Sequence, residues 1–273
     1  MKEPNHVLFI SQEISPYLAD ETPIRTLNRR LPEVFQSHHY DTRTFMPKFG
    51  EINERRNQLH EVIRLSGTNL VIEDTDHPLL IKVTSVQSAR LQIYFIDNDD
   101  YFRRRKGVTD EKGKEYPDND ERCIFYARGV LETIKNLRWT PDIIQCSGWM
   151  SALAPIYIKK AYADTPFFAN SKVVLAIDNN TYQTPFSTKF AQKMLIEGVS
   201  PNDVRSIAGF PVGYEELMRL AIDYSDAIVF ASDNVNQHVV NYAETKGKPI
   251  LPYQENNDMA YLDFCNSLLE NHE

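Results

Sequence analysis

Apolar residues follow two alternating patterns along most of this chain. Short apolar segments rich in β-branched residues alternate with longer segments in which apolar side chains recur every three or four positions. The first pattern is typical of strands buried on both faces, and the second of amphipathic helices. The repeated strand-then-helix order predicts an α/β fold, a Rossmann-like domain with a mostly parallel sheet covered by helices.

The predicted elements follow directly from these two patterns. Predicted strands cover residues 6–11, 42–47, 79–86, 90–97, 142–146, 172–177 and 226–232. Predicted helices cover residues 121–138, 151–162 and 215–224. The strands at 6–11, 142–146, 172–177 and 226–232 are expected inside the sheet because they are apolar throughout. Pro155 is compatible with its helix, since Ser151 is a plausible N-cap and the proline then falls in the first turn.

Two polar segments and a distinct C-terminal part complete the organisation. Residues 50–78 indicate an insertion of short strands, and residues 98–121 a polar loop. We predict one domain over residues 1–246, followed over residues 247–273 by a linker and a docked helix. That helix carries apolar residues at helical spacing, and Met259, Leu262 and Phe264 are expected to be buried.

Composition and charge restrict the class of protein. The chain has 273 residues and is 42% hydrophobic, which is enough for one sizeable core. Its net charge of −8 disfavours nucleic acid and membrane surfaces as partners. The N-terminal apolar segment is too short for a signal peptide or a membrane span. Cys123, Cys146 and Cys265 form no C-x-x-C pair, so reduced thiols and a cytoplasmic location are expected.

Candidate binding residues lie just after the predicted strands, where open α/β sheets bind ligands. They are Glu13 and Tyr17 after the first strand, Ser147 and Trp149 after the central one, and Asn179, Tyr182 and Gln183 after the next. Aromatic rings can stack on sugar C–H faces, while amides and hydroxyls can bond sugar hydroxyls. These residues therefore predict a sugar site. An alternative stays open, in which Trp149 and Tyr182 merely fill the end of the sheet.

Other polar clusters give weaker signals. Residues 97–100 are Asp-Asn-Asp-Asp, a composition more typical of a turn than of a metal site. His38 and His39 lack a third ligand and are expected at the surface, and the basic residues 103–106 are expected in a solvated loop. The sequence indicates no metal, no cofactor and no confident catalytic residue.

A family resemblance appears in six segments taken in order. They are VLFISQEISPY, TRTFMPKFG, YFIDNDDYFRR, YPDNDERCIFYARGVLETI, PDIIQCSGWMSALAPIYIK and VVLAIDNNTYQTPF. Together they resemble the N-terminal catalytic domain of bacterial glycogen synthases and plant starch synthases, from about Val7 to Tyr242. The resemblance implies the N-terminal half of a GT-B glycosyltransferase, whose two domains transfer glucose from ADP-glucose to a 1,4-α-glucan. It also implies that this half holds the glucan acceptor, through the seven residues named above.

The departures from the family pattern concern charge. The family's Lys-x-Gly-Gly-Leu loop is replaced by YLADETPIRTL, in which Asp20 and Glu21 would repel an anion. The family's His-Asp-Trp corresponds to Ser147, Gly148 and Trp149. In the family's His-Asn-x-x-Tyr-Gln-Gly segment, an aspartate, residue 178, stands in place of the histidine.

Three hypotheses follow. The chain is a glucan-binding or regulatory relative with little transfer activity alone, because the family's donor-binding domain is not expected within it. Alternatively, it is an active glucosyltransferase subunit completed by a donor-binding domain from another chain, or a scaffold that binds no sugar. The partners considered are an α-glucan or malto-oligosaccharide, a full-length synthase and a donor-domain chain.

Overall fold

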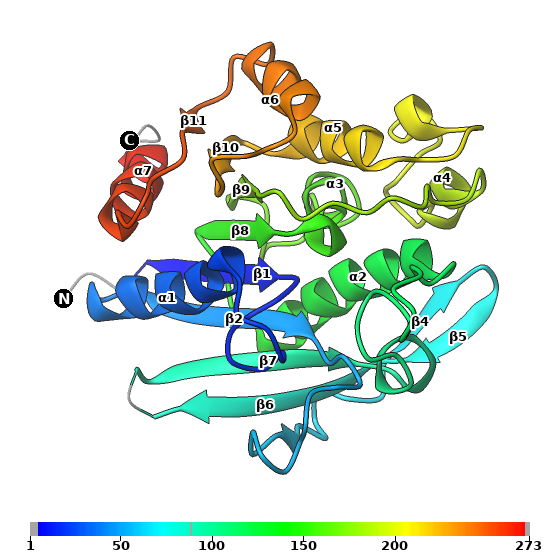
Figure 1. The fold of residues 1–273 in the computed structure, drawn as a ribbon, viewed down its shortest axis with the longest axis horizontal. Helices are drawn as coiled ribbons and strands as arrows, with labels where there is room; N and C mark the ends of the chain where they lie inside the picture. The colour runs from blue at the N-terminus through cyan, green and yellow to red at the C-terminus, as the bar shows by residue number, and fades with distance from the viewer. Residues whose placement is uncertain (1–4, 88, 271–273) are drawn as a thin grey trace.

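Nine strands form the central sheet of the computed structural model, which describes residues 5–87 and 89–270. Their order across the sheet is β11-β10-β9-β8-β1-β2-β7-β6-β3. Neighbouring strands from β11 to β7 are parallel, whereas β6 is antiparallel to β7 and β3 (Figure 1). The strands are β1 (His6–Ser11), β2 (Asp41–Pro47), β3 (His60–Glu61), β6 (Leu80–Val86), β7 (Leu91–Asp97), β8 (Ile143–Ser147), β9 (Lys172–Ile177), β10 (Ala227–Phe230) and β11 (Ile250–Leu251).

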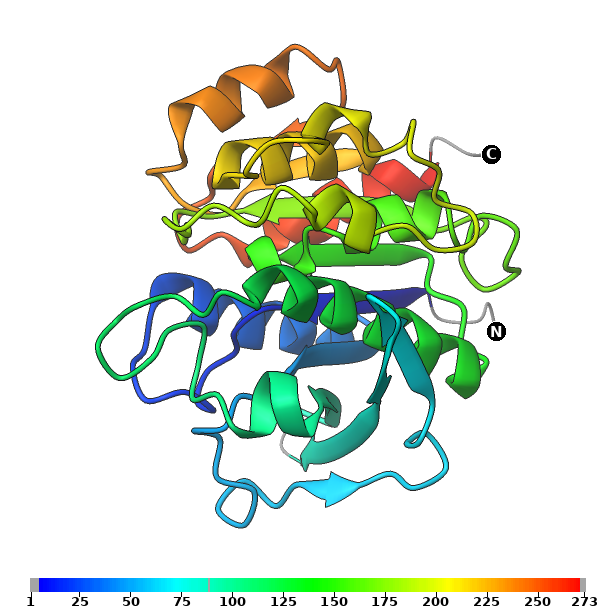
Figure 2. The same ribbon diagram turned by 90° about the vertical axis from the view of Figure 1, so that its right-hand side faces the viewer.

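Helices cover both faces of this sheet (Figures 1 and 2). They are α1 (Pro23–Ser37), α2 (Asn119–Leu137), α3 (Ala154–Lys159), α4 (Phe190–Lys193), α5 (Tyr214–Tyr224), α6 (Gln237–Glu244) and α7 (Asp258–Glu270). Shorter turns are the π-helix η1 (Asp99–Arg103) and the 3-10 helices η2 (Trp149–Ser151) and η3 (Arg205–Ile207). A separate hairpin pairs β4 (Asn69–Ile72) with β5 (Thr75–Pro78). Within the described ranges, no helix has the length and apolar character needed to cross a membrane.

Strand β1 shows why the interior strands are apolar without interruption. Leu8 and Ile10 enter the core beneath α2, α3 and α5, whereas Val7 and Phe9 enter the second core beneath α1 and α7. Successive side chains of a strand point to opposite faces, so burying both faces requires apolar residues at every position. The mostly parallel sheet and the four predicted interior strands are thereby confirmed.

Helix α1 was not predicted, although its sequence carries the signals. The Thr22 side chain caps its N-terminus, and Pro23 occupies the first turn, where a missing N–H is tolerated. Pro32 lies inside the helix and disguises the pattern. The buried apolar residues nevertheless recur at helical spacing, and they are Ile24, Leu27, Leu31 and Phe35.

The helix predicted over residues 151–162 is divided in two. It begins as η2 at Trp149, and α3 starts only at Ala154. The hydroxyl of Ser151 donates to the Gly148 carbonyl, 2.7 Å away, and therefore closes the 3-10 turn instead of capping an α-helix. Pro155 does fall in the first turn of α3, as expected.

The C-terminal residues dock onto the domain. Strand β11 extends the sheet beside β10, and α7 packs against α1, where Arg30 donates to the Asp258 carboxylate at 2.8 Å. Leu262 is 4% exposed, as predicted, and Phe264 is partly buried. The burial predicted for Met259 is wrong, because that side chain is 42% exposed. The boundary between residues 246 and 247 stays a prediction.

The two faces of α7 should differ in their contribution to stability. We expect Leu262→Ala to lower the free energy of unfolding by about 2 to 5 kcal/mol, since it removes a buried side chain and leaves a cavity. Met259→Ala is the control, and we expect a change within about 0.5 kcal/mol at this exposed position. Urea unfolding measures both, and equal losses would show that α7 is not docked as described.

Candidate functional site

The carboxyl ends of β1, β8 and β9 bring the candidate residues to one edge of the sheet. Ser11 pairs with Ser147, and Ser147 pairs with Ala176, so these parallel strands end at the same level. The backbone N–H of Gln12 donates to the Ser147 carbonyl at 2.9 Å and carries the pairing one residue further. The segments that follow each strand therefore emerge side by side.

Strand β8 leads directly into η2 at Gly148, and this strand-to-helix turn is called the crossing below. A glycine is required there because β1 lies very close to the crossing. The φ of Gly148 is +84°, and a Cβ added there would lie 2.5 Å from the Cβ of Gln12. The Gln12 side chain passes directly over the glycine and accepts a hydrogen bond from the Met150 N–H at 3.1 Å. Glycine thus allows the glutamine amide to reach the first turn after β8.

Three buried polar groups around the crossing have no hydrogen-bond partner among the described residues. They are Gln12 Nε2, Ser147 Oγ and Trp149 Nε1, on side chains that are 1 to 2% exposed. The amide and indole nitrogens can only donate, and the hydroxyl can donate or accept. Leaving such a group unpaired costs roughly 1 to 3 kcal/mol, so the crossing has an unmet demand for acceptor oxygens.

The predicted aromatic residues form a buried cluster. The Trp149 and Tyr182 ring centroids lie 5.1 Å apart, and Tyr182 stacks on Phe186 at 4.4 Å. Trp149 is 1% exposed and Tyr182 is 4% exposed, with the Tyr182 hydroxyl donating to the Val212 carbonyl. Neither ring presents a free face to solvent. The geometry favours the alternative in which these two rings fill the end of the sheet.

The remaining predicted residues are divided between the surface and the core. Asn179 and Gln183 are exposed on the loop after β9, where they can contact a ligand. Glu13 is partly exposed, whereas Tyr17 is buried and packs edge-on against Phe95 of β7. The structure thus brings together a polar surface loop and a buried aromatic base, and the glucan-binding role of these residues stays a prediction.

Carboxylates surround the N-terminus of α1, the segment that the family resemblance pairs with the Lys-x-Gly-Gly-Leu loop. Arg25 Nε lies 2.8 Å from a carboxylate oxygen of Glu13 and is neutralised by it. Glu21 accepts from the Ser15 hydroxyl at 3.1 Å, and Asp20 immediately precedes it in the chain. A helix N-terminus attracts anions, but here acidic side chains of the chain itself supply the negative charge.

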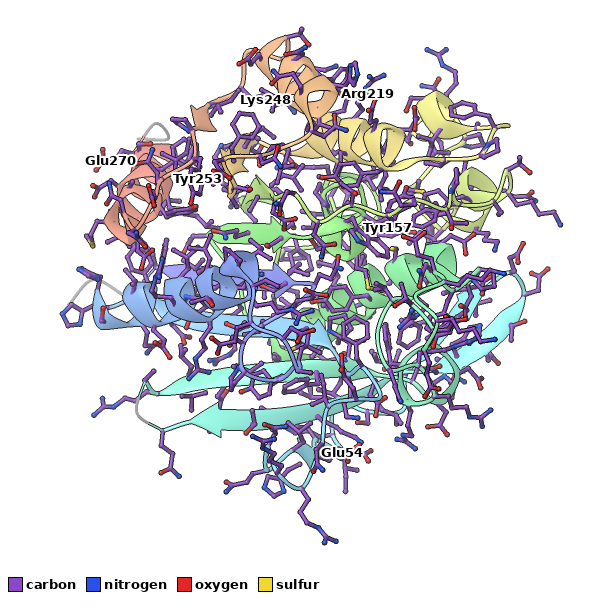
Figure 3. The ribbon with its side chains drawn as sticks, in the orientation of Figure 1. Glu54, Tyr157, Arg219, Lys248, Tyr253 and Glu270 are labelled. Carbon is purple, nitrogen blue, oxygen red and sulfur yellow. The ribbon has the colours of Figure 1, made fainter. Side chains whose placement is uncertain are left out.

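A second group of cations at this edge is also paired. Lys48 Nζ lies 3.3 Å from Glu54, which Figure 3 labels on the loop beyond β2, and Lys82 also contacts this carboxylate. Lys82 and Arg103 lie 3.2 and 3.3 Å from the buried carboxylate of Asp97. These cations are therefore engaged within the protein.

The acidic segment at residues 97–100 forms the N-terminus of the short π-helix η1. The Asn98 side chain accepts from the backbone N–H groups of Asp100 and Tyr101, and so caps η1. Among residues 5–87 and 89–270, no three His, Cys, Asp or Glu side chains are grouped so that they could hold a metal ion. His38 and His39 are exposed at the end of α1.

Asp178 is the ionisable group that replaces the family's histidine. Burial raises the pKa of its carboxyl to about 7, the nearby charge of Glu13 adds to this, and the Asn180 N–H, 2.6 Å from Oδ1, partly offsets it. At neutral pH the carboxyl is divided between its protonated and ionised forms. The sequence shows an aspartate at this position, but its raised pKa follows from burial that only the folded structure reveals.

A mostly parallel sheet covered by helices, with polar groups at its carboxyl edge, is the Rossmann-like α/β architecture found in GT-B glycosyltransferases. Residues 6–249 match the starch synthase catalytic domain family. This chain belongs to the glycogen and starch synthase family. The match confirms the resemblance inferred from the six segments.

Individual relatives agree with this assignment. The glycogen synthase of Chlorobium limicola is 37% identical over 195 residues, which cover 71% of this chain and 40% of the relative. The glycogen synthase of Chlorobaculum tepidum is 34% identical over 239 residues, which cover 87% of this chain and 48% of the relative. The chain thus spans about half the length of these relatives.

A solved structure shows the same fold. The catalytic domain of starch synthase IV from Arabidopsis thaliana, bound to ADP and acarbose, superposes with a TM-score of 0.71 at 16% sequence identity. The match covers 92% of this chain and 52% of the plant domain. The fold of this chain therefore corresponds to about half of that catalytic domain.

Gly148 can be tested against a glycine with a similar positive φ. Gly148→Ala introduces a left-handed alanine and a clash with Gln12, whereas Gly209→Ala, at φ +85°, meets nothing within 4 Å. We expect Gly148→Ala to lower the free energy of unfolding by about 1 to 3 kcal/mol more than Gly209→Ala. Urea titration gives the difference, and identical losses would argue against the close approach.

The titration of Asp178 predicts a pH dependence of stability. Because the folded pKa of about 7 lies above the ordinary aspartate pKa of 3.8, the folded protein keeps a proton that the unfolded chain releases between these values. The free energy of unfolding should therefore fall as the pH rises through this window. Asp178→Asn should remove this fall and be more stable than the parent at about pH 8.

The control for this measurement is Asp164→Asn, at an exposed aspartate in the loop after α3. Urea unfolding at about pH 5 and about pH 8 compares the three proteins. We expect the control to follow the parent at both values. A parent whose stability is constant across this range would contradict the burial described for Asp178.

Proposed function

We propose that this chain binds an α-glucan at the carboxyl edge of its sheet and, by itself, transfers little or no glucose from ADP-glucose. One observation carries this proposal: the edge combines neutral hydrogen-bonding groups with cations that are already paired to carboxylates. Neutral groups suit a sugar polymer. Cations that are not free cannot stabilise a diphosphate leaving group.

Glucan binding is supported by groups at two depths. Asn179 and Gln183 are open to solvent and offer amide donors and acceptors to sugar hydroxyls. Beneath them, the buried side chains of Gln12, Ser147 and Trp149 form an uncharged base that supports the exposed loop without contacting a ligand directly. Family membership favours an α-glucan over other polyhydroxylated ligands.

Weak transfer is supported by the charges at the same edge. Glycosyl transfer from a nucleotide sugar depends strongly on stabilising the departing diphosphate by cations and oriented N–H groups. Ser147 and Gly148 carry no charge, Arg25 is held by Glu13, and Asp20 adds a negative charge beside α1. A donor-binding domain would have to supply the cations that stabilise the diphosphate.

Binding is tested by calorimetric titration with maltoheptaose. We expect the chain to bind this oligosaccharide and Gln183→Ala to weaken binding about 3- to 10-fold, because one hydrogen-bonding side chain is removed. Gln87→Ala is the matched control, since Gln87 is an exposed glutamine in the β6–β7 turn at the opposite edge. Absence of binding by the parent chain would overturn the glucan-binding role.

Transfer is tested with the same preparation. Incorporation of glucose from ADP-glucose into glycogen should be near background for the purified chain. Robust turnover would overturn the proposal that the edge cannot stabilise the diphosphate. Stimulation when a full-length glycogen synthase is added, beyond the activity of that synthase alone, would favour completion by another chain.

A further inference from the structure

The segment before α2 contains a hairpin that the sequence did not indicate. Thr109 and Glu115 form an antiparallel bridge, and the Asp110 N–H donates to the Lys114 carbonyl at 2.8 Å. The side chain of Asp110 also accepts from the Lys112 and Lys114 N–H groups and closes the tip. Residues 108–116, called the edge hairpin below, are therefore a defined structure within a polar loop.

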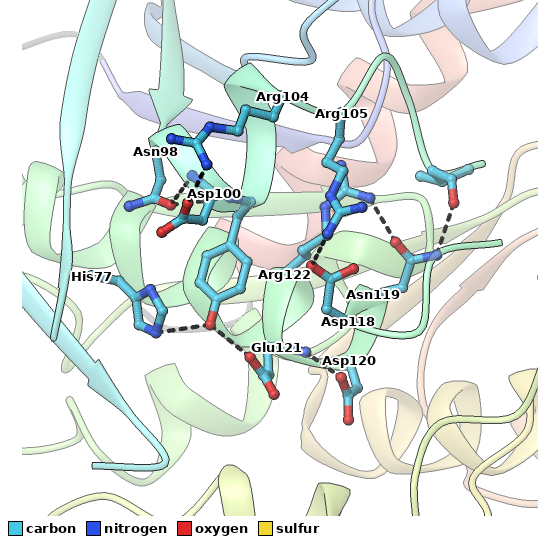
Figure 4. Close-up of polar contacts among 12 residues, drawn as sticks. His77, Asn98, Asp100, Arg104, Arg105, Asp118, Asn119, Asp120, Glu121 and Arg122 are labelled. Carbon is cyan, nitrogen blue, oxygen red and sulfur yellow. Dashed lines mark hydrogen bonds and ion pairs between the residues drawn. The ribbon is translucent and has the colours of Figure 1, made fainter. Parts of the chain in front are cut away.

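The base of the edge hairpin is anchored to the start of α2, as Figure 4 shows for its labelled residues. Asn119 Nδ2 donates to the Val108 carbonyl at 3.0 Å, and Asn119 Oδ1 accepts from the buried Arg122 at 2.6 Å. Arg105, on the segment that leads into the edge hairpin, pairs with Asp118 at 3.1 Å. Contacts on both sides of the hairpin thus fix its base.

From this base, Glu115 reaches the loop after β9. Its two carboxylate oxygens lie 2.9 and 3.1 Å from the Gln183 backbone nitrogen, and one of them accepts from the Thr184 N–H at 2.6 Å. Two successive backbone N–H groups that converge on one carboxylate form a charge-assisted contact, stronger than a neutral hydrogen bond. The contact joins segments 68 residues apart.

We propose that Glu115 is a positioning residue of the glucan site. Its carboxylate fixes the backbone of the loop that presents Gln183 and Asn179, while the Gln183 side chain stays open to solvent. This inference rests on the proposed function. It adds a residue of the edge hairpin to a site that is otherwise built from the segments after β1, β8 and β9. A loop held before binding loses less conformational entropy when a ligand is bound.

The first test needs no ligand. In Glu115→Ala, amide hydrogen exchange at Gln183 and Thr184 should accelerate by about tenfold or more, since both N–H groups lose their acceptor. Glu111→Ala is the control, because Glu111 lies at the tip of the same hairpin and pairs with Lys106 at 2.7 Å. Unchanged exchange at both amides in Glu115→Ala would overturn the contact itself.

The second test distinguishes positioning from a general structural role. We expect Glu115→Ala to weaken maltoheptaose binding about 3- to 10-fold without lowering the melting temperature, Glu115→Gln to recover part of the loss, and Glu111→Ala to bind like the parent. In a Gln183→Ala background, Glu115→Ala should have a much smaller effect, because it acts through the loop that carries Gln183.

The outcomes separate the two proposals. If the parent binds maltoheptaose and Glu115→Ala binds equally well, the positioning role is overturned and the proposed function stands. Full additivity of Glu115→Ala and Gln183→Ala would also overturn it. If the parent does not bind, the proposed function fails and the positioning role fails with it, whatever the exchange rates show.

Discussion

The architecture depends on covering both faces of β1. Its odd- and even-numbered side chains enter two different cores, one closed by α1 and α7 and the other by α2, α3 and α5. A strand that is apolar on both sides is stable only when each face is covered, and here crossover helices between parallel neighbours supply that cover. The carboxyl ends of those neighbours then meet at one edge. The candidate site is a geometric consequence of that requirement.

At this edge the chain has the fold of its family, and its cations are paired with carboxylates of the same chain. Gly148 lets the backbone turn closely past β1, and Trp149 and Tyr182 fill the end of the sheet. Carboxylates lie where a phosphate-binding loop would need cations, and Arg25 forms an ion pair with Glu13. Shape complementarity and hydrogen bonding suffice to hold a neutral polymer, whereas group transfer also needs charge stabilisation. The two requirements are separable, and under the proposed function this edge meets only the first with its own residues.

Long-range polar contacts complete the site. Asp178 is buried where two strands end, and Glu115 crosses from the edge hairpin to the loop after β9. The Glu115 contact joins residues 68 positions apart, whereas the hydrogen bond of Asp178 to the Asn180 N–H is local and only its burial comes from distant segments. A carboxylate gains from such contacts only when folding brings N–H groups or a low-dielectric environment to it. Their effect therefore belongs to the folded protein.

The sequence by itself determined the class of fold and the place of the site. Unbroken apolar segments such as residues 172–177 can be satisfied only in a sheet buried on both faces, so periodicity revealed the interior strands. Helix α1 was not predicted because a proline inside it, Pro32, and the polar loop before it are both signals against a helix. They obscure a regular apolar spacing. In this segment the proline argues against a helix and the apolar spacing argues for one, and the sequence does not show which signal prevails.

Only the tertiary structure decided which candidate residues are accessible. Trp149 and Gln183 look equally suited to a sugar on residue type, yet one is buried and the other is exposed. Met259 and Leu262 both fit the apolar face of a helix, but the docking of α7 on α1 buries only Leu262. Burial depends on which elements pack together, and the pKa of Asp178 and the partners of Glu115 depend on the same packing. Residue type sets what a side chain can do, and the folded neighbours set whether it does so.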